Sequence, residues 1–121
     1  MADFQQAADV LDPAALGNLR ELVGGDEAFL VELIDTFLGD APQLLADMRQ
    51  AAANGDAAVL HRAAHSLKSN SAEFGALTLS ALCRELEMSG KAGALEGAAE
   101  KVAQAVAEYE KVRAALEAIR G

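Results

Sequence analysis

Large apolar residues recur every three or four positions along most of the chain, and polar residues fill the positions between them. This spacing places the apolar side chains on one face of an α-helix, and no stretch shows the two-residue alternation of a β-strand. Glycines and N-capping aspartates divide the pattern into one short and four long segments. The predicted helices lie from Asp12-Pro13 to Gly24-Gly25, from Asp26 to Asn54-Gly55, from Asp56 to Gly75, from around Leu79 to near Ser89-Gly90, and from Gly93 onwards.

Four long amphipathic helices joined by short turns bury their apolar faces most simply in a bundle. The sequence therefore predicts an all-α fold, an antiparallel up-and-down four-helix bundle with a short extra N-terminal helix, over residues 13–120. Residues 1–12 lack a clean period and are predicted to form an N-terminal tail. Pro42 removes the helical hydrogen bond to the carbonyl of Leu38, so we expect a kink in the longest helix, with a break at 39–41 as the alternative.

Composition and charge narrow the classes of partner. Hydrophobic residues make up 52% of the chain, much of it alanine, and aromatic residues make up 4%, which suits close helix packing. Lys and Arg number 10 against 19 Asp and Glu, which gives a net charge of −9. This charge argues against nucleic acid and against an anionic membrane surface, and it leaves a basic or neutral protein as the expected partner.

The sequence also indicates the compartment. Cys83 is the single cysteine, so no internal disulfide can form, and it falls on the apolar stripe of its helix as a small core residue does. The acidic start of the chain and the absence of an uncharged apolar run of about 18 residues predict a cytoplasmic protein with no membrane span. We expect a monomer, because the bundle buries its own apolar faces.

Both histidines lie on the third predicted helix, and their direction relative to its apolar stripe can be computed. At about 100° per residue, the stripe of Leu60, Leu67 and Phe74 points about 180–220° away from His65. His65 is therefore predicted to face solvent. The residues within about 60° of it are polar or small, namely His61, Arg62, Lys68, Ser69 and Ala72.

An exposed imidazole is largely neutral near neutral pH, so one ring nitrogen has a free lone pair and can act as a nucleophile. Lys68 follows His65 by one turn, and no acid four residues away on that helix face pairs with it. A phosphoryl group is the electrophile that suits this pair, because its oxygens carry negative charge that an ammonium group stabilises. An inert surface histidine is the alternative interpretation.

The stretch from His65 to Ala76, which reads HSLKSNSAEFGA, is followed by Leu79, Cys83, Leu86 and Glu87. These residues resemble the motif of histidine-containing phosphotransfer (HPt) domains. The resemblance extends over nearly the whole chain in the order and length of the helices. It implies a four-helix bundle that accepts a phosphoryl group from an aspartate of one receiver domain and passes it to another receiver domain in a multistep two-component phosphorelay.

The same resemblance implies a role for each matching residue. His65 is the phosphorylated residue, Lys68 stabilises the charge of the phosphoryl group, Glu87 orients the imidazole, and Gly75 forms the turn after the active helix. Two positions depart from the family pattern: Ser69 stands where glycine is common, and Asn70 stands where a smaller residue is common.

The resemblance further implies a phosphoryl carrier, not an enzyme, with no intrinsic cofactor. The sequence offers no carboxylate cluster suited to Mg²⁺, so the metal and the catalytic groups are expected on the receiver partner. The expected partners are response-regulator receiver domains and, as a further candidate, a hybrid histidine kinase. We predict that the docking surface includes His61, Arg62, Ser69, Ala72, Ala41 and Leu45.

Three other readings differ in class. His61 and His65 have the spacing of a zinc-binding helix, but Arg62 occupies the place of the metalloprotease glutamate, so no metal is expected. A di-iron bundle needs Glu-x-x-His pairs, which the chain lacks. A helical adaptor that binds a receiver or kinase domain without being phosphorylated remains the alternative function, although an adaptor does not require an exposed histidine beside a lysine.

Overall fold

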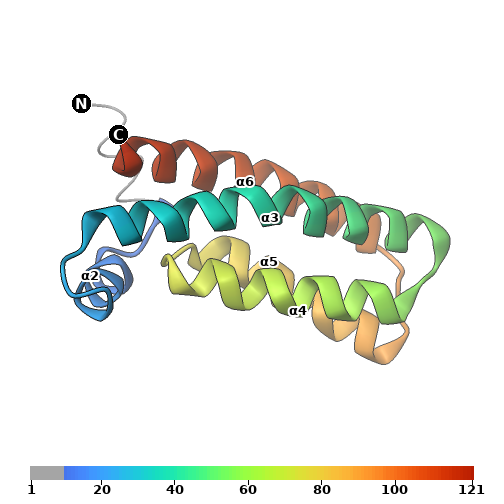
Figure 1. Ribbon diagram of the computed structural model, residues 1–121. Helices are drawn as coiled ribbons and strands as arrows, with labels where there is room; N and C mark the ends of the chain where they lie inside the picture. Colours follow the sequence, from blue (N-terminus) through green and yellow to red (C-terminus); the bar gives the residue numbers. More distant parts are fainter. Residues whose placement is uncertain (1–9) are drawn as a thin grey trace.

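The computed structural model describes residues 10–121, and this part of the chain is helical without a strand (Figure 1). The all-α prediction is therefore confirmed. None of the helices in the described part combines the length and the apolar character that crossing a membrane requires. The helices are α2 (Pro13–Leu22), α3 (Glu27–Asn54), α4 (Ala57–Glu73), α5 (Leu77–Ala92) and α6 (Ala98–Arg120).

Local capping explains where three of the helices begin. The carboxylates of Asp12, Asp26 and Asp56 each accept a hydrogen bond from a backbone amide two or three residues later, at 3.0–3.2 Å. Such bonds satisfy amides that have no partner within the first helical turn. Gly55 ends α3 in the left-handed conformation, with φ of 72°. These starts and this end agree with the sequence prediction.

Two other boundaries differ from the prediction. Helix α5 continues through Gly90 to Ala92, and the left-handed Gly93 follows it. Helix α6 begins at Ala98, and not directly after Gly93, because a short turn separates the two helices. Glycine often ends a helix, but Gly90 is buried within one, so its role is packing.

Pro42 lies inside α3, which is continuous from Glu27 to Asn54. The break considered at 39–41 is therefore wrong. Proline removes one hydrogen bond and its ring needs space, and Pro42 is exposed, so the ring lies on the solvent side of the helix. The helix is regular on both sides of Pro42 and continues across it.

The four long helices pack in a closed circuit. Helix α3 contacts α4 and α6, α5 also contacts α4 and α6, and α2 packs against α3 and α4 at one end (Figure 1). Alanines, among them Ala64 and Ala105, are fully buried between the helices, which lets the backbones approach closely. Cys83 lies in this core as predicted, and burial raises the pKa of its thiol to about 12.

The end of the predicted tail packs against the helices. Leu11 is buried in the core, and the amide of Asp12 donates a hydrogen bond to the carbonyl of Gly75 at 2.8 Å. Residues 1–9 lie outside the described part, so the tail over 1–12 and the domain boundary at 13 stay predictions.

Gly90 sets the distance between α4 and α5. A Cβ atom added at this position would lie 2.7 Å from the backbone nitrogen of His61 and 2.8 Å from the carbonyl oxygen of Ala57. Both atoms belong to the backbone of α4, which cannot rotate away as a side chain can. The two helices therefore approach as closely as they do because residue 90 has no side chain.

We predict that Gly90→Ala lowers the free energy of unfolding by about 1–3 kcal/mol, the range for overpacking a tight contact, although alanine is the better helix former. Gly39→Ala is the matched control, because Gly39 is also helical and a Cβ there would meet nothing within 4 Å. That variant should be stabilised by about 0.5–1 kcal/mol. Urea unfolding followed by circular dichroism measures both; an equal response would contradict the packing role of Gly90.

Candidate functional site

His65 lies in the middle of α4 and faces solvent. Its side chain is 60% exposed, whereas Leu60 and Leu67 on the opposite side of the helix are fully buried. This is the orientation that the helical rotation predicts. The imidazole is thus fixed to a packed helix by its backbone and open to a partner at its ring.

Glu87 of α5 brings the site together. Its Oε2 atom lies 2.5 Å from Nδ1 of His65, and its Oε1 atom accepts a hydrogen bond from Nζ of Lys68 at 2.6 Å. The side chain of Glu87 is 14% exposed, so this carboxylate lies largely out of water between the two helices. One carboxylate therefore contacts both of the α4 residues that the sequence singled out.

The charge of Glu87 determines which ring nitrogen of His65 carries the hydrogen. The hydrogen bond from Lys68, more than that from His65, holds the pKa of the Glu87 carboxyl below its usual value, and partial burial opposes this shift. An ionised carboxylate can only accept hydrogen bonds, so Nδ1 of His65 must carry the hydrogen. In the neutral ring, Nε2 is then the nitrogen with a free lone pair.

The structure corrects the environment predicted for Lys68. No acid on α4 pairs with it, as the sequence indicates, but Glu87 reaches it from α5. The carboxylate of Glu87 therefore already balances part of the positive charge of Lys68, and the Lys68 side chain is half-buried, not freely exposed. Its ammonium group still lies beside the imidazole, because both groups contact the same carboxylate.

A second contact joins α4 and α5 at this level. The hydroxyl of Ser80 donates a hydrogen bond to the backbone carbonyl of Lys68 at 3.0 Å. Together with the close approach at Gly90, this bond fixes the register of the two helices on both sides of Glu87. Sequence reasoning missed both residues, because their roles depend on which helix faces which.

His61 lies at the edge of the site. Its Nε2 atom is 3.9 Å from Oε2 of Glu87, which is too long for a hydrogen bond, and its ring centroid is 6.4 Å from that of His65. Within residues 10–121, no group of three or more metal-ligating side chains has a geometry that could hold an ion. The structure thus gives His61 no contact comparable with that of His65.

The predicted docking residues divide into two groups. Arg62, Ser69 and Ala72 are exposed and His61 is half-exposed, so all four are accessible. The prediction is wrong for Ala41 and Leu45, which are 0% and 5% exposed. Both lie on the inward stripe of α3, together with Ile34, Phe37 and Met48, and they pack in the core.

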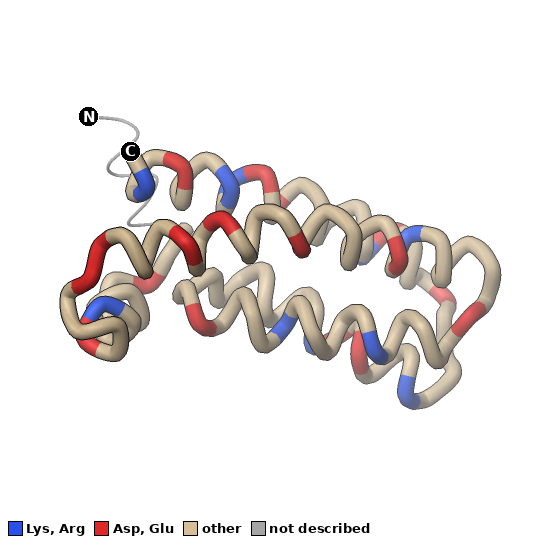
Figure 2. The backbone as a smooth tube through the Cα atoms, viewed as in Figure 1, with Lys and Arg blue, Asp and Glu red and all other residues tan. Residues whose placement is uncertain are grey.

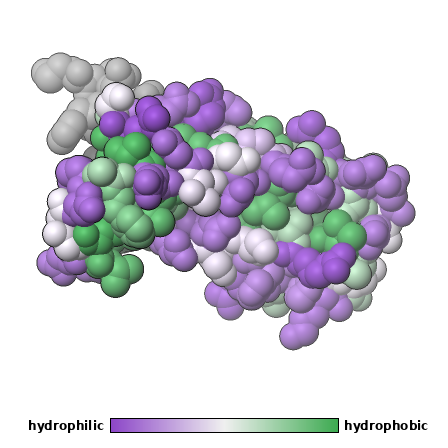
Figure 3. Space-filling view, in the orientation of Figure 1, coloured by the Kyte–Doolittle hydropathy of each residue, from purple (hydrophilic) through white to green (hydrophobic). Residues whose placement is uncertain are grey.

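An apolar groove lies beside the C-terminal end of α4. It is formed by α2, the start of α3 and Ala72, and Leu22 and Phe29 expose much of their side chains at its rim. Figure 3 shows hydrophobic surface gathered over this end of the molecule. Gly75 closes α4 there with φ of 77°, and its Cβ would lie 2.8 Å from the backbone of Asp12.

Two neighbouring residues of α4 have different surroundings. Asn70, which the rotation directs toward the bundle, is half-buried. Ser71 is fully buried, and its hydroxyl has no hydrogen-bond partner within the described residues. The same rotation places Ser71 at about 240° from His65, close to the buried stripe, so the sequence contained this signal.

Comparisons with known proteins agree with this geometry. A family model described as Hpt domain matches residues 32–121. Among solved structures, the chain is similar to the crystal structure of histidine-containing phosphotransfer protein B (HptB) from Pseudomonas aeruginosa PAO1. The two share 34% sequence identity over 92% of this chain and 94% of that chain, with a TM-score of 0.84. A search of the curated proteins finds no match.

The family model covers well over half of the 121 residues, and the solved structure is alike in both sequence and fold. The chain therefore belongs to the Hpt domain family, the histidine phosphotransfer family that its sequence resembles.

Proposed function

We propose that this protein accepts a phosphoryl group on Nε2 of His65 from the aspartate of a receiver domain and delivers it to the aspartate of another. The observation that carries this proposal is the exposed imidazole of His65, whose Nδ1 contacts the largely buried carboxylate of Glu87. That contact leaves Nε2, with its lone pair, as the available nucleophile.

In the forward step, Nε2 attacks phosphorus in line with the aspartyl oxygen of the receiver. The P–N bond forms, the P–O bond breaks, and its electron pair stays on the aspartate carboxylate. The hydrogen on Nδ1 remains in place, so the imidazole ring gains positive charge that Glu87 stabilises. Transfer to the second receiver is the reverse of this step.

Lys68 supplies the cation for the phosphoryl oxygens. Its ammonium group is bonded to Glu87 and can make further hydrogen bonds with its remaining hydrogens. Glu87 thus holds the ammonium near the imidazole before a phosphoryl group arrives. The positive charge is positioned in advance, which lowers the reorganisation needed during transfer.

The remaining roles follow from this assignment. The protein is a carrier, and the catalytic groups and Mg²⁺ belong to the receiver partner. Response-regulator receivers and a hybrid histidine kinase are the proposed partners of a cytoplasmic monomer. They dock on the accessible residues His61, Arg62, Ser69 and Ala72. The closed circuit of helix contacts supports the antiparallel up-and-down four-helix bundle that this surface needs.

A helical adaptor that acts by binding alone is the competing function. An adaptor would use the same exposed face of α4 but would gain nothing from a carboxylate bonded to Nδ1 of His65. The His65–Glu87 contact therefore favours phosphotransfer.

The first test is the site of phosphorylation. After incubation with a phosphorylated receiver domain, the wild-type chain should carry acid-labile, alkali-stable label, because phosphohistidine has this stability. His65→Gln should remove the label, whereas His61→Ala, the control, should retain most of it. Label that persists in His65→Gln, or that disappears equally in both variants, would overturn the assignment of His65.

The second test concerns the shared carboxylate. Lys68→Ala and Glu87→Ala should each slow transfer by about tenfold, less than for a fully enclosed oxyanion site, because this site is partly open to water. The double variant should lose less than the product of the two effects, since both residues act through one network. Rapid-quench measurements of labelling give the rates, and circular dichroism checks the fold. Independent, multiplying losses would contradict the network.

A further inference from the structure

The charged residues of the chain are unevenly distributed. Residues 57–92, which contain α4, α5 and the turn between them, include four Lys or Arg and three Asp or Glu. The rest of the chain includes six Lys or Arg and sixteen Asp or Glu. Figure 2 shows this contrast: α3 carries mostly acidic residues, whereas α4 carries basic residues along its length. The net charge of −9 therefore does not describe the side of the molecule that carries His65.

Ion pairing sharpens the contrast. Within the described residues, Arg49, Arg62, Arg84 and Lys91 form no ion pair, and the last three lie on α4 and α5. The acids of α5 are both engaged, since Glu85 pairs with Lys101 at 3.1 Å and Glu87 pairs with Lys68. The third acid, Glu73, lies at the other end of α4, beside the apolar groove.

The exposed cations of α5 share a stripe with exposed apolar residues. Met88 and Leu77 are 60% and 53% exposed, which makes them two of the most exposed large apolar residues described. Spacings of three or four residues place the stripe on one face of the helix. We define the α5 stripe as Leu77, Ala81, Arg84, Met88 and Lys91.

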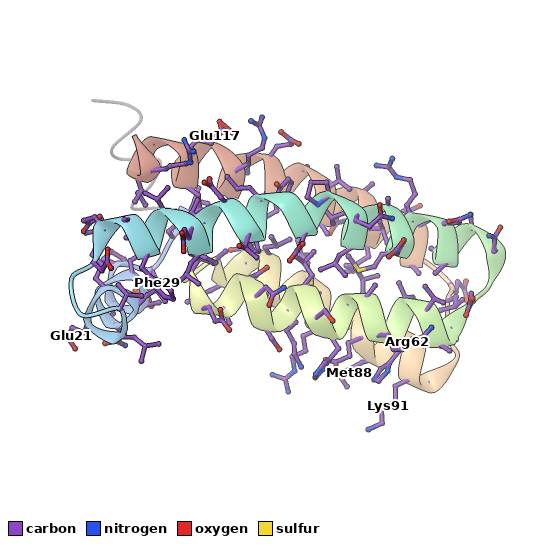
Figure 4. All side chains as sticks on the ribbon, in the orientation of Figure 1. Glu21, Phe29, Arg62, Met88, Lys91 and Glu117 are labelled. Carbon is purple, nitrogen blue, oxygen red and sulfur yellow. The ribbon has the colours of Figure 1, made fainter. Side chains whose placement is uncertain are left out.

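The α5 stripe is continuous with the site. A shallow groove contains Lys68, Ser69 and Ala72 of α4 together with Leu77 and Arg84 of α5. At the other end, Arg62, Met88 and Lys91 project from the same edge of the α4 and α5 pair (Figure 4). A protein seated on His65 and reaching past α4 on this side therefore meets the stripe.

We propose that the α5 stripe is a second part of the docking surface and binds an acidic, partly apolar face of the partner that exchanges phosphoryl groups with His65. This inference rests on the proposed phosphotransfer function. It replaces the basic or neutral partner expected from net charge, because the surface that faces the partner is cationic.

Two physical arguments select an acidic partner. Arginine and methionine are enriched at protein interfaces, and unpaired cations on this stripe gain most from carboxylates on the opposing surface. The remaining acidic surface of the chain repels such a partner and steers it toward the α4 and α5 side. A basic partner would instead be drawn to α3, since residues 27–54 include five Asp or Glu and one Arg.

The test compares two double charge reversals. Arg84→Glu with Lys91→Glu alters the α5 stripe, whereas Arg49→Glu with Lys111→Glu makes the same change in charge at exposed positions of α3 and α6. The probe is the receiver domain of the source organism that labels wild-type His65 fastest, phosphorylated with acetyl phosphate. The stripe variant should lower the second-order rate constant of labelling by about tenfold at low salt, and the control by less than about twofold.

Two readouts separate docking from chemistry. Direct labelling of His65 by phosphoramidate, a small donor that needs no docking surface, should be unchanged in the stripe variant. The loss with the receiver should shrink at high salt, because exposed charges are screened. Equal rates for the stripe and control variants, or a loss that salt does not reduce, would overturn the proposal.

A neutral variant tests whether the introduced glutamates themselves disturb the fold or the site. If phosphoramidate labelling falls in the charge reversal, Arg84→Ala with Lys91→Ala decides: a smaller, salt-sensitive loss supports the proposal, and a wild-type rate overturns it. Failure of the proposed function looks different, since no receiver would then label His65 of the wild-type chain. That result would remove both proposals, whereas normal labelling of the stripe variant removes the docking inference alone.

Discussion

The contact of Glu87 with both His65 and Lys68 is the interaction on which the site depends. A carboxylate that is largely out of water and bonded to two cationic or potentially cationic groups is costly to leave without partners, so the three side chains hold one another in place. The contact also decides which imidazole nitrogen carries hydrogen. Orientation, proton position and the placement of positive charge are thus set by one residue that reaches across from the neighbouring helix.

That contact requires the two helices to keep a fixed separation and register. Gly90 allows the backbone of α5 to approach His61 and Ala57, and the Ser80 hydroxyl bonds to the carbonyl of Lys68 on the other side of Glu87. Among the described helices, packing is most extensive between α4 and α5. The chemistry of an exposed side chain is therefore governed by buried features that a view of the surface does not reveal.

The periodicity of the sequence was sufficient for the helices, for the outward direction of His65 and for the burial of Cys83, because each depends on local geometry along one helix. It was insufficient wherever a second helix decides the result. Lys68 has a partner on α5, and Gly90 is a point of close approach and not a helix end. The burial of Ala41 and Leu45 is different, because their spacing with Ile34, Phe37 and Met48 along α3 already places them on the apolar stripe, and their assignment to the docking surface went against that periodicity. The resemblance to phosphotransfer domains supplied Glu87, which periodicity alone does not connect with His65.

The small residues that line the groove with Lys68 have a thermodynamic consequence. Ser69, Ala72 and Ala81 are exposed and have few or no rotatable bonds, whereas an immobilised Lys or Arg side chain loses about 1.5–2 kcal/mol of rotamer entropy. A molecule that covers the centre of this surface orders almost nothing there. The entropic penalty of association is confined to the long side chains at its margin, so the central area is rigid before any encounter takes place.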